Sequence, residues 1–585
     1  MKQGRAQRGF TIIETLIGMG ILTIISTSIY FSYSNILEIV QTAQYNNAAL
    51  SIMESRIEVA RNMRYEDVGV VGGVPAGKLP QSETITLGTT PYTLHTYVRN
   101  IDDSFDGVLA GTPNDTAPAD YKLLELQVTC DTCVRYRLLT MATYIAPKNL
   151  ETASKNGNLF VRVLNASGLP VSGATVRVTN SNVTPAVDLT DTTDVNGILQ
   201  LVDIATSSVG YHIVVSKSGY NNDQTYPPGA PANPLKPDAT VATQQLTISS
   251  LFIDRVSTVS LRVRDQFCSP IQSFDFLLTG DKLIATQPDI PKYSSALSTD
   301  SNGLFTNATM EWDTYSLRPT DTAYDIAGTL SSLSFTINPN SSQFISWMAT
   351  SKSQDSVSIS IADQNGNPLD DATVQLTKTG YDQTRVSGRI ELLQTDWALG
   401  AYAEKSEFLD TSSAGELTLG LSNGSYASAG AEWLISESYN LGTSSSNFTS
   451  LNWVPTTQPL EAGSTAVRFQ LAANNDNSTW NWVGPDGTGA SFFTSSGQAV
   501  PLALNGNRYL RYRILLNTDD DMVTPRIESV GIGFSSGCIP SGQTYFNGLS
   551  AGEYTLNVTR AGYQNFTAPL SIQDTWQRIQ IQLSP

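Results

Sequence analysis

The sequence has few of the residues that carry most catalytic and metal-binding chemistry. Its 585 residues include four cysteines and two histidines, His95 and His212. Nucleophilic triads and transition-metal sites need such residues at defined positions, so the chain offers little material for either. It contains no phosphate-binding glycine loop, dinucleotide-binding fingerprint or HExxH zinc motif. A distant carboxylate pair of the glycosidase type stays open, but we expect that the protein is not an enzyme and holds no metal cofactor.

Charge is also scarce, and positive charge is scarcer than negative. Charged residues make up 15% of the chain, and 35 Lys and Arg against 53 Asp and Glu leave a net charge of −18. This balance argues against nucleic acid as a partner of the bulk of the chain. The composition is closer to a secreted all-β protein than to a cytosolic enzyme, and the length predicts several domains.

A charge-poor run of 21 residues, Phe10–Tyr30, follows the basic residues Lys2, Arg5 and Arg8. As a helix it spans roughly 31 Å, about one hydrocarbon core. The basic flank is expected to stay in the cytoplasm, which makes this a single-pass membrane protein with its bulk on the outer side. A signal peptide is disfavoured, because no small-x-small cleavage site follows the run. A plain anchor is disfavoured too, because Glu14 costs on the order of 3 kcal/mol in lipid.

The N-terminal segment resembles the prepilin leader of type IV pilins and pseudopilins. The matching features are a basic leader at residues 1–9 ending in Gly9, then Phe10 and Thr11, and Glu14 as the fifth residue counted from Phe10. The resemblance implies that a prepilin peptidase cleaves the Gly9–Phe10 bond and methylates the Phe10 amine. It also implies that Glu14 compensates the Phe10 ammonium of a neighbouring pilin subunit, so that the charge pair sets the register of assembly.

The fold expected for this part is an α+β pilin-like module, with a helix over 10–64, membrane-spanning over 10–30, and a β-sheet head over 65–155. One helix face is predicted to lie on the sheet, from apolar residues at helical spacing: Ile36, Val40, Ala43, Leu50, Met53, Ile57 and Ala60. Four segments are predicted to form the strands of this sheet: Glu83–Leu87, Tyr92–Val98, Lys122–Thr129 and Val134–Tyr144. Cys130 and Cys133 lie at a predicted hairpin tip, where an oxidising compartment favours a disulfide over free thiols.

Three later stretches share one pattern of an alternating strand, a Gly/Pro turn and a second alternating strand. They start at Asn158, Thr258 and Ser356, and their spacing of about 100 residues marks whole domains. They resemble the carboxypeptidase regulatory-like domain, a seven-strand β-sandwich, which implies spacer or binding modules without an active site. We expect the first two sandwiches at 156–250 and 251–350.

The third copy is interrupted. Its halves are predicted at 356–388 and 536–585, with a domain nested over 389–535 that resembles jelly-roll sandwiches of the galactose-binding-like sort. Insertions survive where the two ends of a loop lie close together. Cys268 and Cys538 fall in neighbouring sandwiches and are a candidate second disulfide.

The nested segment contains the candidate recognition residues. These residues are four tryptophans: Trp433, Trp453, Trp480 and Trp482. Because aromatic faces can stack on sugars, the four form a candidate glycan platform, although any single tryptophan is more often a core residue. Asp519, Asp520 and Asp521 follow one another in a turn, where calcium is an open alternative and a solvated acidic turn is favoured.

These features together predict a pilin-like subunit of a type IV pilus or pseudopilus, low in copy number and located at the tip, with sandwich domains for adhesion or surface recognition. Its expected partners are other pilin subunits, the prepilin peptidase, the membrane and surface glycans. Two alternatives remain open: a pseudopilin of a type II secretion system, and a glycan-binding protein or enzyme that uses a pilin anchor.

Overall fold

The structure is a computed structural model that describes residues 12–133, 135–147, 153–330, 333–398, 400–412, 415–426, 430–444, 446–573 and 576–585. Gly9 and Phe10, the predicted cleavage and methylation positions, lie outside the described residues. The chain divides into two compact units, which are considered separately. The first comprises Met1–Val256 with Leu283–Ile290, and the second comprises Ser257–Lys282 with Pro291–Pro585.

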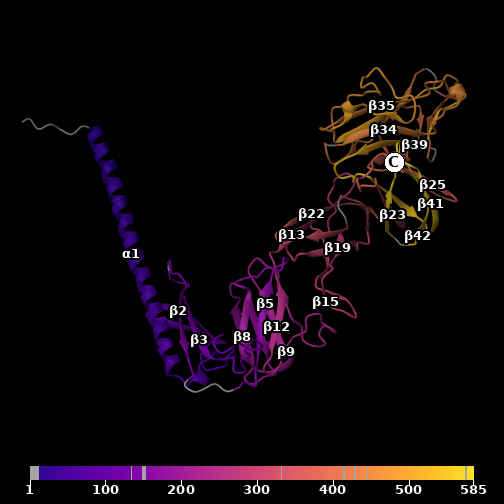
Figure 1. Ribbon diagram of the computed structural model, residues 1–585. Coiled ribbons are helices and arrows are strands. Elements are labelled where there is room, and N and C mark those ends of the chain that lie inside the picture. Colours follow the sequence, from indigo (N-terminus) through magenta and orange to yellow (C-terminus); the bar gives the residue numbers. More distant parts are fainter. Residues whose placement is uncertain are drawn as a thin grey trace, which may run out of the picture. The chain divides into compact units, whose positions relative to one another are not determined.

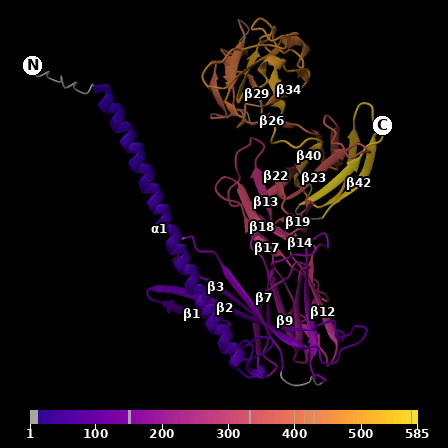
Figure 2. The ribbon, with the colours of Figure 1, turned by 60° about the vertical axis from the view of Figure 1, so that its left-hand side comes forward.

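The first unit begins with one helix of 51 residues, α1 (Ile12–Asn62). Its N-terminal half extends away from the sheet of the head, and its C-terminal half lies along that sheet (Figures 1 and 2). By length and composition the helix is apolar enough to cross a membrane. Its buried residues all lie in the last third: Ala49, Ile52, Met53, Ile57 and Ala60.

The predicted buried face of the helix is therefore partly wrong. Met53, Ile57 and Ala60 are buried, whereas Ile36, Val40, Ala43 and Leu50 are exposed. The sheet is too short to reach the earlier turns. Leu50 lies within the packed part of the helix but faces away from the sheet.

The sheet of the head has four antiparallel strands in the order β1-β2-β3-β4. They are β1 (Ser82–Leu87), β2 (Thr90–Ile101), β3 (Tyr121–Thr129) and β4 (Leu139–Ile145). The first three lie close to the predicted segments, whereas β4 begins five residues later than predicted, and Val134 lies outside the described residues. Alternate residues of β2 and β3 point inward, so Leu94, Leu124 and Leu126 share one core with Met53 and Ile57 of the helix. The short 3-10 helix η1 (Tyr65–Asp67) joins α1 to the sheet.

A β-sandwich completes the first unit. One sheet has the order β10-β9-β6-β7 with β11 on β9, and the other has the order β12-β5-β8. The strands are β5 (Gly157–Leu164), β6 (Thr175–Asn180), β7 (Val187–Thr192), β8 (Ile198–Ile204), β9 (Ser207–Ser216), β10 (Asp223–Gln224), β11 (Ala239–Val241) and β12 (Leu246–Phe252). The sandwich is tied to the head by a bidentate pair in which Arg99 donates to buried Asp191 at 2.7 and 2.8 Å.

The second unit opens with a further sandwich built from two four-stranded sheets, β18-β13-β22-β20 and β17-β14-β19-β21. Phe274 and Phe276 meet Trp347 edge-on in its core, with ring centroids 5.9 and 6.3 Å apart. The strands are β13 (Ser257–Arg264), β14 (Asp275–Gly280), β17 (Ser294–Ser298), β18 (Leu304–Met310), β19 (Asp313–Pro319), β20 (Tyr324–Thr329), β21 (Ser334–Ile337) and β22 (Ser342–Ser351). Short strands β15 (Leu283–Ala285) and β16 (Ile290–Pro291) lie between β14 and β17 in the chain.

The same turn follows the first strand of the three sandwiches that begin near residues 157, 257 and 355. The side chain of Asn165, Asp265 or Asp363 accepts backbone N–H groups two and four residues later, at 2.8–3.0 Å. Such side-chain caps fold a turn locally, which is why the sequence repeats are visible at these positions.

The third sandwich is assembled from two distant stretches of chain. Strand β23 (Asp355–Ala362) pairs with β40 (Gln543–Leu549) on one side and with β43 (Gln577–Gln582) on the other. In the second sheet, β24 (Thr373–Lys378) lies between β25 (Tyr381–Val386) and β41 (Gly552–Thr559), and β42 (Phe566–Ile572) follows β41. Val357 and Leu376 from the first stretch share a core with Leu556 from the second.

The nested domain between these stretches is a separate two-sheet sandwich. Its main sheets have the orders β26-β39-β34-β36 and β27-β32-β37-β33, with β35 paired to β37. The principal strands are β26 (Ile390–Gln394), β27 (Tyr402–Lys405), β32 (Glu432–Ser436), β33 (Tyr439–Asn440), β34 (Asn447–Val454), β35 (Val467–Asn474), β36 (Gln498–Ala499), β37 (Tyr509–Leu516) and β39 (Ser529–Ser535).

Short elements complete the nested domain: β28 (Leu409–Asp410), β29 (Leu417–Leu419), β30 (Leu421–Ser422), β31 (Ser425–Tyr426), β38 (Arg526–Ile527), and the 3-10 helices η2 (Leu460–Ala462) and η3 (Leu502–Leu504). The first strand pairs with the last, with Ile390 opposite Phe534. This pairing brings the two ends of the insert together, so the interrupted sandwich can close around them.

A carboxylate in the loop after β2 is held in an unfavourable charged state. One oxygen of Asp102 accepts the Leu109 N–H at 3.1 Å, and the other is buried without a hydrogen-bond partner. Burial, followed by the negative charges of Asp115, Asp120 and Asp106, raises the pKa of Asp102 to about 6. The folded head therefore binds more protons than the unfolded chain between about pH 4 and pH 6, and its stability falls as pH rises through that window.

We expect Asp102→Asn to stabilise the head at pH 7.5 and to have little effect at pH 4, because the neutral amide removes a penalty that exists only above the window. Amides of β2 and β3 should exchange with deuterium several-fold more slowly in the variant at pH 7.5. Asp131→Asn, at an exposed position of the same head, serves as the control and should leave exchange unchanged. Equal protection of wild type and Asp102→Asn at pH 7.5 contradicts the assignment.

Candidate functional site

The first half of α1 combines an all-round apolar surface with an acidic residue in its first turn. Ile13, Ile17 and Leu22 are largely exposed, and Glu14 lies among them near the N-terminus of the helix. The hydroxyls in this stretch return their hydrogen bonds to the preceding turn, as Thr23 does to Met19 O and Ser28 to Ile24 O, both at 2.8 Å. These polar groups are therefore satisfied without water, as a lipid or helix-packed environment requires.

Glu14 is placed for an interaction along the helix axis. A carboxylate in the first turn is favoured by the positive end of the helix dipole. Its neighbours on the helix surface are apolar, so a second helix packed here brings a cation beside it at low dielectric, where the attraction is strongest. Phe10 lies outside the described residues, and its pairing with Glu14 stays a prediction.

All four cysteines are oxidised in the structure. Cys130 and Cys133 form a disulfide at the end of β3, with Cα atoms 5.4 Å apart, and both belong to the core under the helix. Cys268 and Cys538 form the other, with Cα atoms 5.5 Å apart and 270 residues between them in sequence. This second bridge joins the turn after β13 to the segment between β39 and β40, where Phe267 stacks on Phe534.

The four candidate tryptophans divide into two kinds. Trp453 points inward from β34, is only 3% exposed and stacks on Phe469 at 4.7 Å, so its assignment to a recognition surface is wrong. The alternation of β34 explains this, because Leu451 and Trp453 both occupy inward positions. Trp433, Trp480 and Trp482 are half-buried at the surface.

Trp480 and Trp482 lie over arginines that were not among the residues predicted from sequence. The guanidinium carbon of Arg511 is 4.7 Å from the ring centroid of Trp480, and that of Arg513 is 5.2 Å from Trp482. In the same arrangement, the guanidinium carbon of Arg468 is 5.0 Å from the ring centroid of Phe492. We call Arg468, Trp480, Trp482, Phe492, Arg511 and Arg513 the arginine–aromatic face. The alternation of "YLRYRILL" in β37 places its arginines outward, and that pattern was the available signal.

The aspartates of the acidic turn do not converge on one point. Asp520 uses its carboxylate to accept the Met522 N–H at 2.9 Å, and Asp519 packs against Gly463. Across the part of the chain that the structure describes, no group of three or more carboxylate, thiol or imidazole side chains converges to hold a metal ion. The calcium alternative therefore has no structural support at Asp519, Asp520 and Asp521.

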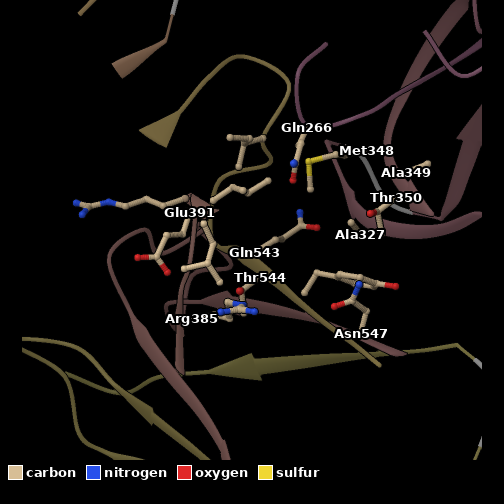
Figure 3. Close-up of a pocket in the computed structure, with 15 residues that line it drawn as sticks. Gln266, Ala327, Met348, Ala349, Thr350, Arg385, Glu391, Gln543, Thr544 and Asn547 are labelled. Atoms are coloured by element: carbon tan, nitrogen blue, oxygen red, sulfur yellow. The ribbon is translucent and has the colours of Figure 1, made fainter. Parts of the chain in front are cut away.

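A pocket of about 180 Å³ lies in the second unit, lined by β26, β40 and the sandwich that precedes them (Figure 3). Figure 3 labels Gln543 among its lining residues, and that side chain exchanges hydrogen bonds with the backbone of Thr329. The Gln543 side chain therefore links two sandwiches.

Comparison with known proteins identifies the N-terminal segment. Residues 4–30 match the model of the prokaryotic N-terminal methylation motif. The chain carries a prepilin-type N-terminus. In general, that motif accompanies processing by a prepilin peptidase and assembly with other pilin subunits. The comparison with curated proteins found no match.

Several solved structures align with parts of this prepilin-type chain at low similarity. The Bacillus anthracis TIE protein is 12% identical over 86% of this chain and 61% of its own, with a TM-score of 0.16, so the chain spans about three-fifths of its length. A streptococcal ancillary pilin is 12% identical over 38% of this chain and 75% of its own, with a TM-score of 0.17. The minor pilin GBS52 of Streptococcus agalactiae is 11% identical over 33% of this chain and 96% of its own, with a TM-score of 0.16. TM-scores this low carry no argument about function.

The long-range disulfide gives a direct prediction. Cys268→Ser with Cys538→Ser should lower the free energy of unfolding of the second unit by about 2–4 kcal/mol, because the bridge closes a very long loop in the unfolded chain. Cys130→Ser with Cys133→Ser is the control for removal of a disulfide. It should lower the free energy of unfolding by less, because the loop that this disulfide closes is short. Alkylation without reductant, read by mass spectrometry, should modify no cysteine, and labelled Cys268 and Cys538 would refute the pairing.

Proposed function

We propose that this pilin-like subunit occupies a low-copy position at the tip of a type IV pilus or pseudopilus and uses its sandwich domains for adhesion or surface recognition. The observation that carries the proposal is the size of the domains beyond the pilin module. The helix and head end near residue 147, and the sandwiches and the nested domain extend from there to the C-terminus.

A steric argument favours the tip. Helices packed in a filament core lie about 8–10 Å apart. A four-stranded sheet is already roughly 15 Å wide across its strands, at about 4.8 Å per step, and every sandwich here has two sheets. If every subunit carried three sandwiches and a nested domain, neighbours along the shaft would compete for the same space. One copy at the end of the filament meets no such competition.

The proposal gives the chain no catalytic role. The two histidines support this, because neither belongs to a nucleophile–base arrangement. His212 on β9 contacts Asp238 through Nδ1 at 2.9 Å within the first sandwich, and His95 lies on β2 opposite Gln127. Export by a secretion pseudopilus and enzymatic action from a pilin anchor are the outcomes against which the proposal is tested.

Electron microscopy of filaments with an epitope label in the nested domain tests the location. Label at filament ends, in numbers far below those of the major subunit, is the expected result. Label distributed along shafts, or label on the cell body without filaments, contradicts the proposal. Loss of protein secretion with intact filaments and intact adhesion, in a strain that lacks the chain, favours the secretion alternative.

Assembly itself depends on the N-terminal segment. Gly9→Val should block cleavage, leaving a longer chain by N-terminal sequencing, because the peptidase needs a small residue before the cut. Glu14→Val should be cleaved normally and yet be depleted from filaments at least tenfold, since the charge pair is lost. Glu54→Val, an exposed position farther along α1, is the matched control and should assemble normally. Wild-type assembly of Glu14→Val would show that the charge pair is not needed.

A further inference from the structure

The arginine–aromatic face has a regular spacing of positive charge. On β37, Arg511 and Arg513 are two residues apart and point to the same side of the sheet. In the pairing of β37 with β35, Arg468 lies opposite Leu515, the next residue on that side. The Cα positions of the three arginines therefore follow one another at intervals of about 7 Å along the strand direction, and the third is displaced by one strand.

The face is held in place before any ligand arrives. Gln470 is fully buried, and its amide donates to Gly489 O at 3.0 Å and to Ser491 O at 2.8 Å. The same amide accepts a hydrogen bond from Arg513 Nη2. Gln470 thus fixes one of the arginines and also the loop over residues 475–492 that follows β35, which we call the covering loop. Side chains ordered in this way lose little further conformational entropy on binding.

The positive charge of the face is not neutralised by the protein around it. Within the described ranges, no carboxylate forms an ion pair with Arg468, Arg511 or Arg513, and the Nε atom of each is buried without a hydrogen-bond partner. Burial lowers the pKa of Arg513 from its ordinary value, with no carboxylate acting against that effect. By contrast, Arg526 of the same domain forms two ion pairs. Its Nη1 atom lies 3.2 Å from Glu416 Oε1, and its Nη2 atom lies 3.5 Å from Glu528 Oε1.

The domain that carries these three arginines is otherwise acidic. Between residues 390 and 535 the basic residues are Lys405, Arg468, Arg508, Arg511, Arg513 and Arg526, among a large excess of Asp and Glu. The acidic residues of the covering loop are engaged locally, since Asp476 accepts the Ser478 and Thr479 N–H groups and Asp486 accepts the Thr488 N–H. Three positive charges gathered on one face of an acidic protein complement an anionic partner.

We propose that the arginine–aromatic face binds an acidic polysaccharide, a proposal that rests on the adhesive function proposed above and names its ligand class. The terminal nitrogens of a guanidinium group can bind carboxylate or sulfate oxygens through two parallel hydrogen bonds, and the half-buried rings of Trp480 and Trp482 offer apolar surface to sugar rings. A nucleic acid fits less well. It carries a phosphate at every residue, and its affinity depends on many simultaneous phosphate contacts, which an acidic chain with three available arginines does not provide.

The test measures binding of the full chain, in detergent, to immobilised alginate as a uronate polymer, dextran sulfate as a sulfated polymer, neutral dextran, and single-stranded poly(dT). We expect binding to at least one of the acidic polymers that weakens with salt, and none to dextran. Arg511→Gln with Arg513→Gln should reduce the affinity about tenfold or more. Arg526→Gln removes a positive charge that is already paired, and should leave the affinity unchanged.

Four results overturn the proposal: no binding to either acidic polymer, equal binding to neutral dextran, equal loss of affinity in the Arg526→Gln control, or binding to poly(dT) at least as tight as to the acidic polymers. If the double glutamine variant fails to fold, the Arg511→Lys and Arg513→Lys pair decides. It keeps the charge and loses the planar fork, so affinity should fall about threefold or more, and wild-type affinity in a folded lysine variant counts against the proposal.

These outcomes are separate from those of the location test. A chain found at filament tips that binds none of the polymers leaves the proposed function standing and removes the ligand class. A chain found along shafts removes the proposed function, whatever the polymers show.

Discussion

The first half of α1 presents apolar side chains on every side and carries one carboxylate, Glu14, in its first turn. Water is a poor environment for the first feature, and lipid is a poor environment for the second. The predicted pairing of Glu14 with the Phe10 ammonium of a neighbouring subunit would accommodate both. Within the first unit, the head takes only the last third of the helix into its core, around Met53 and Ile57.

The arrangement beyond the first sandwich depends on closure between distant parts of the chain. The third sandwich exists only because β23 and β24 find β40, β41 and β43 across an insertion of some 150 residues. That pairing is feasible since β26 and β39, the first and last strands of the insert, lie side by side. The Cys268–Cys538 bridge then holds the exit of the insert to the preceding sandwich. Nesting places a complete domain outward from the chain without adding another flexible junction between sandwiches.

The nested domain separates its aromatic residues by function. Trp453 and Phe469 fill the interior, where their area contributes to stability. Trp480 and Trp482 lie outside, each against an arginine, with Gln470 fastening the loop that carries Phe492 over the same sheet. Such stacking orders side chains that would otherwise be mobile. An ordered row of cations suits a repetitive anionic ligand better than a compact one, which is why the polymer class is the one proposed.

Local patterns in the sequence were sufficient for the parts of this protein that depend on neighbours in the chain. The apolar run with Glu14, the alternating strands and the Asn165, Asp265 and Asp363 turns are all determined by residues within a few positions of one another. Local patterns did not determine which residues of the helix are buried. Burial of Ala49 and Ile52, and exposure of Ile36 and Val40, depend on where a sheet of four strands ends. Local patterns also did not determine which tryptophans are buried and which lie at the surface. Whether Trp453 faces a core or Trp480 faces an arginine is decided by strand pairing between segments tens of residues apart, and only the tertiary structure brings those segments together.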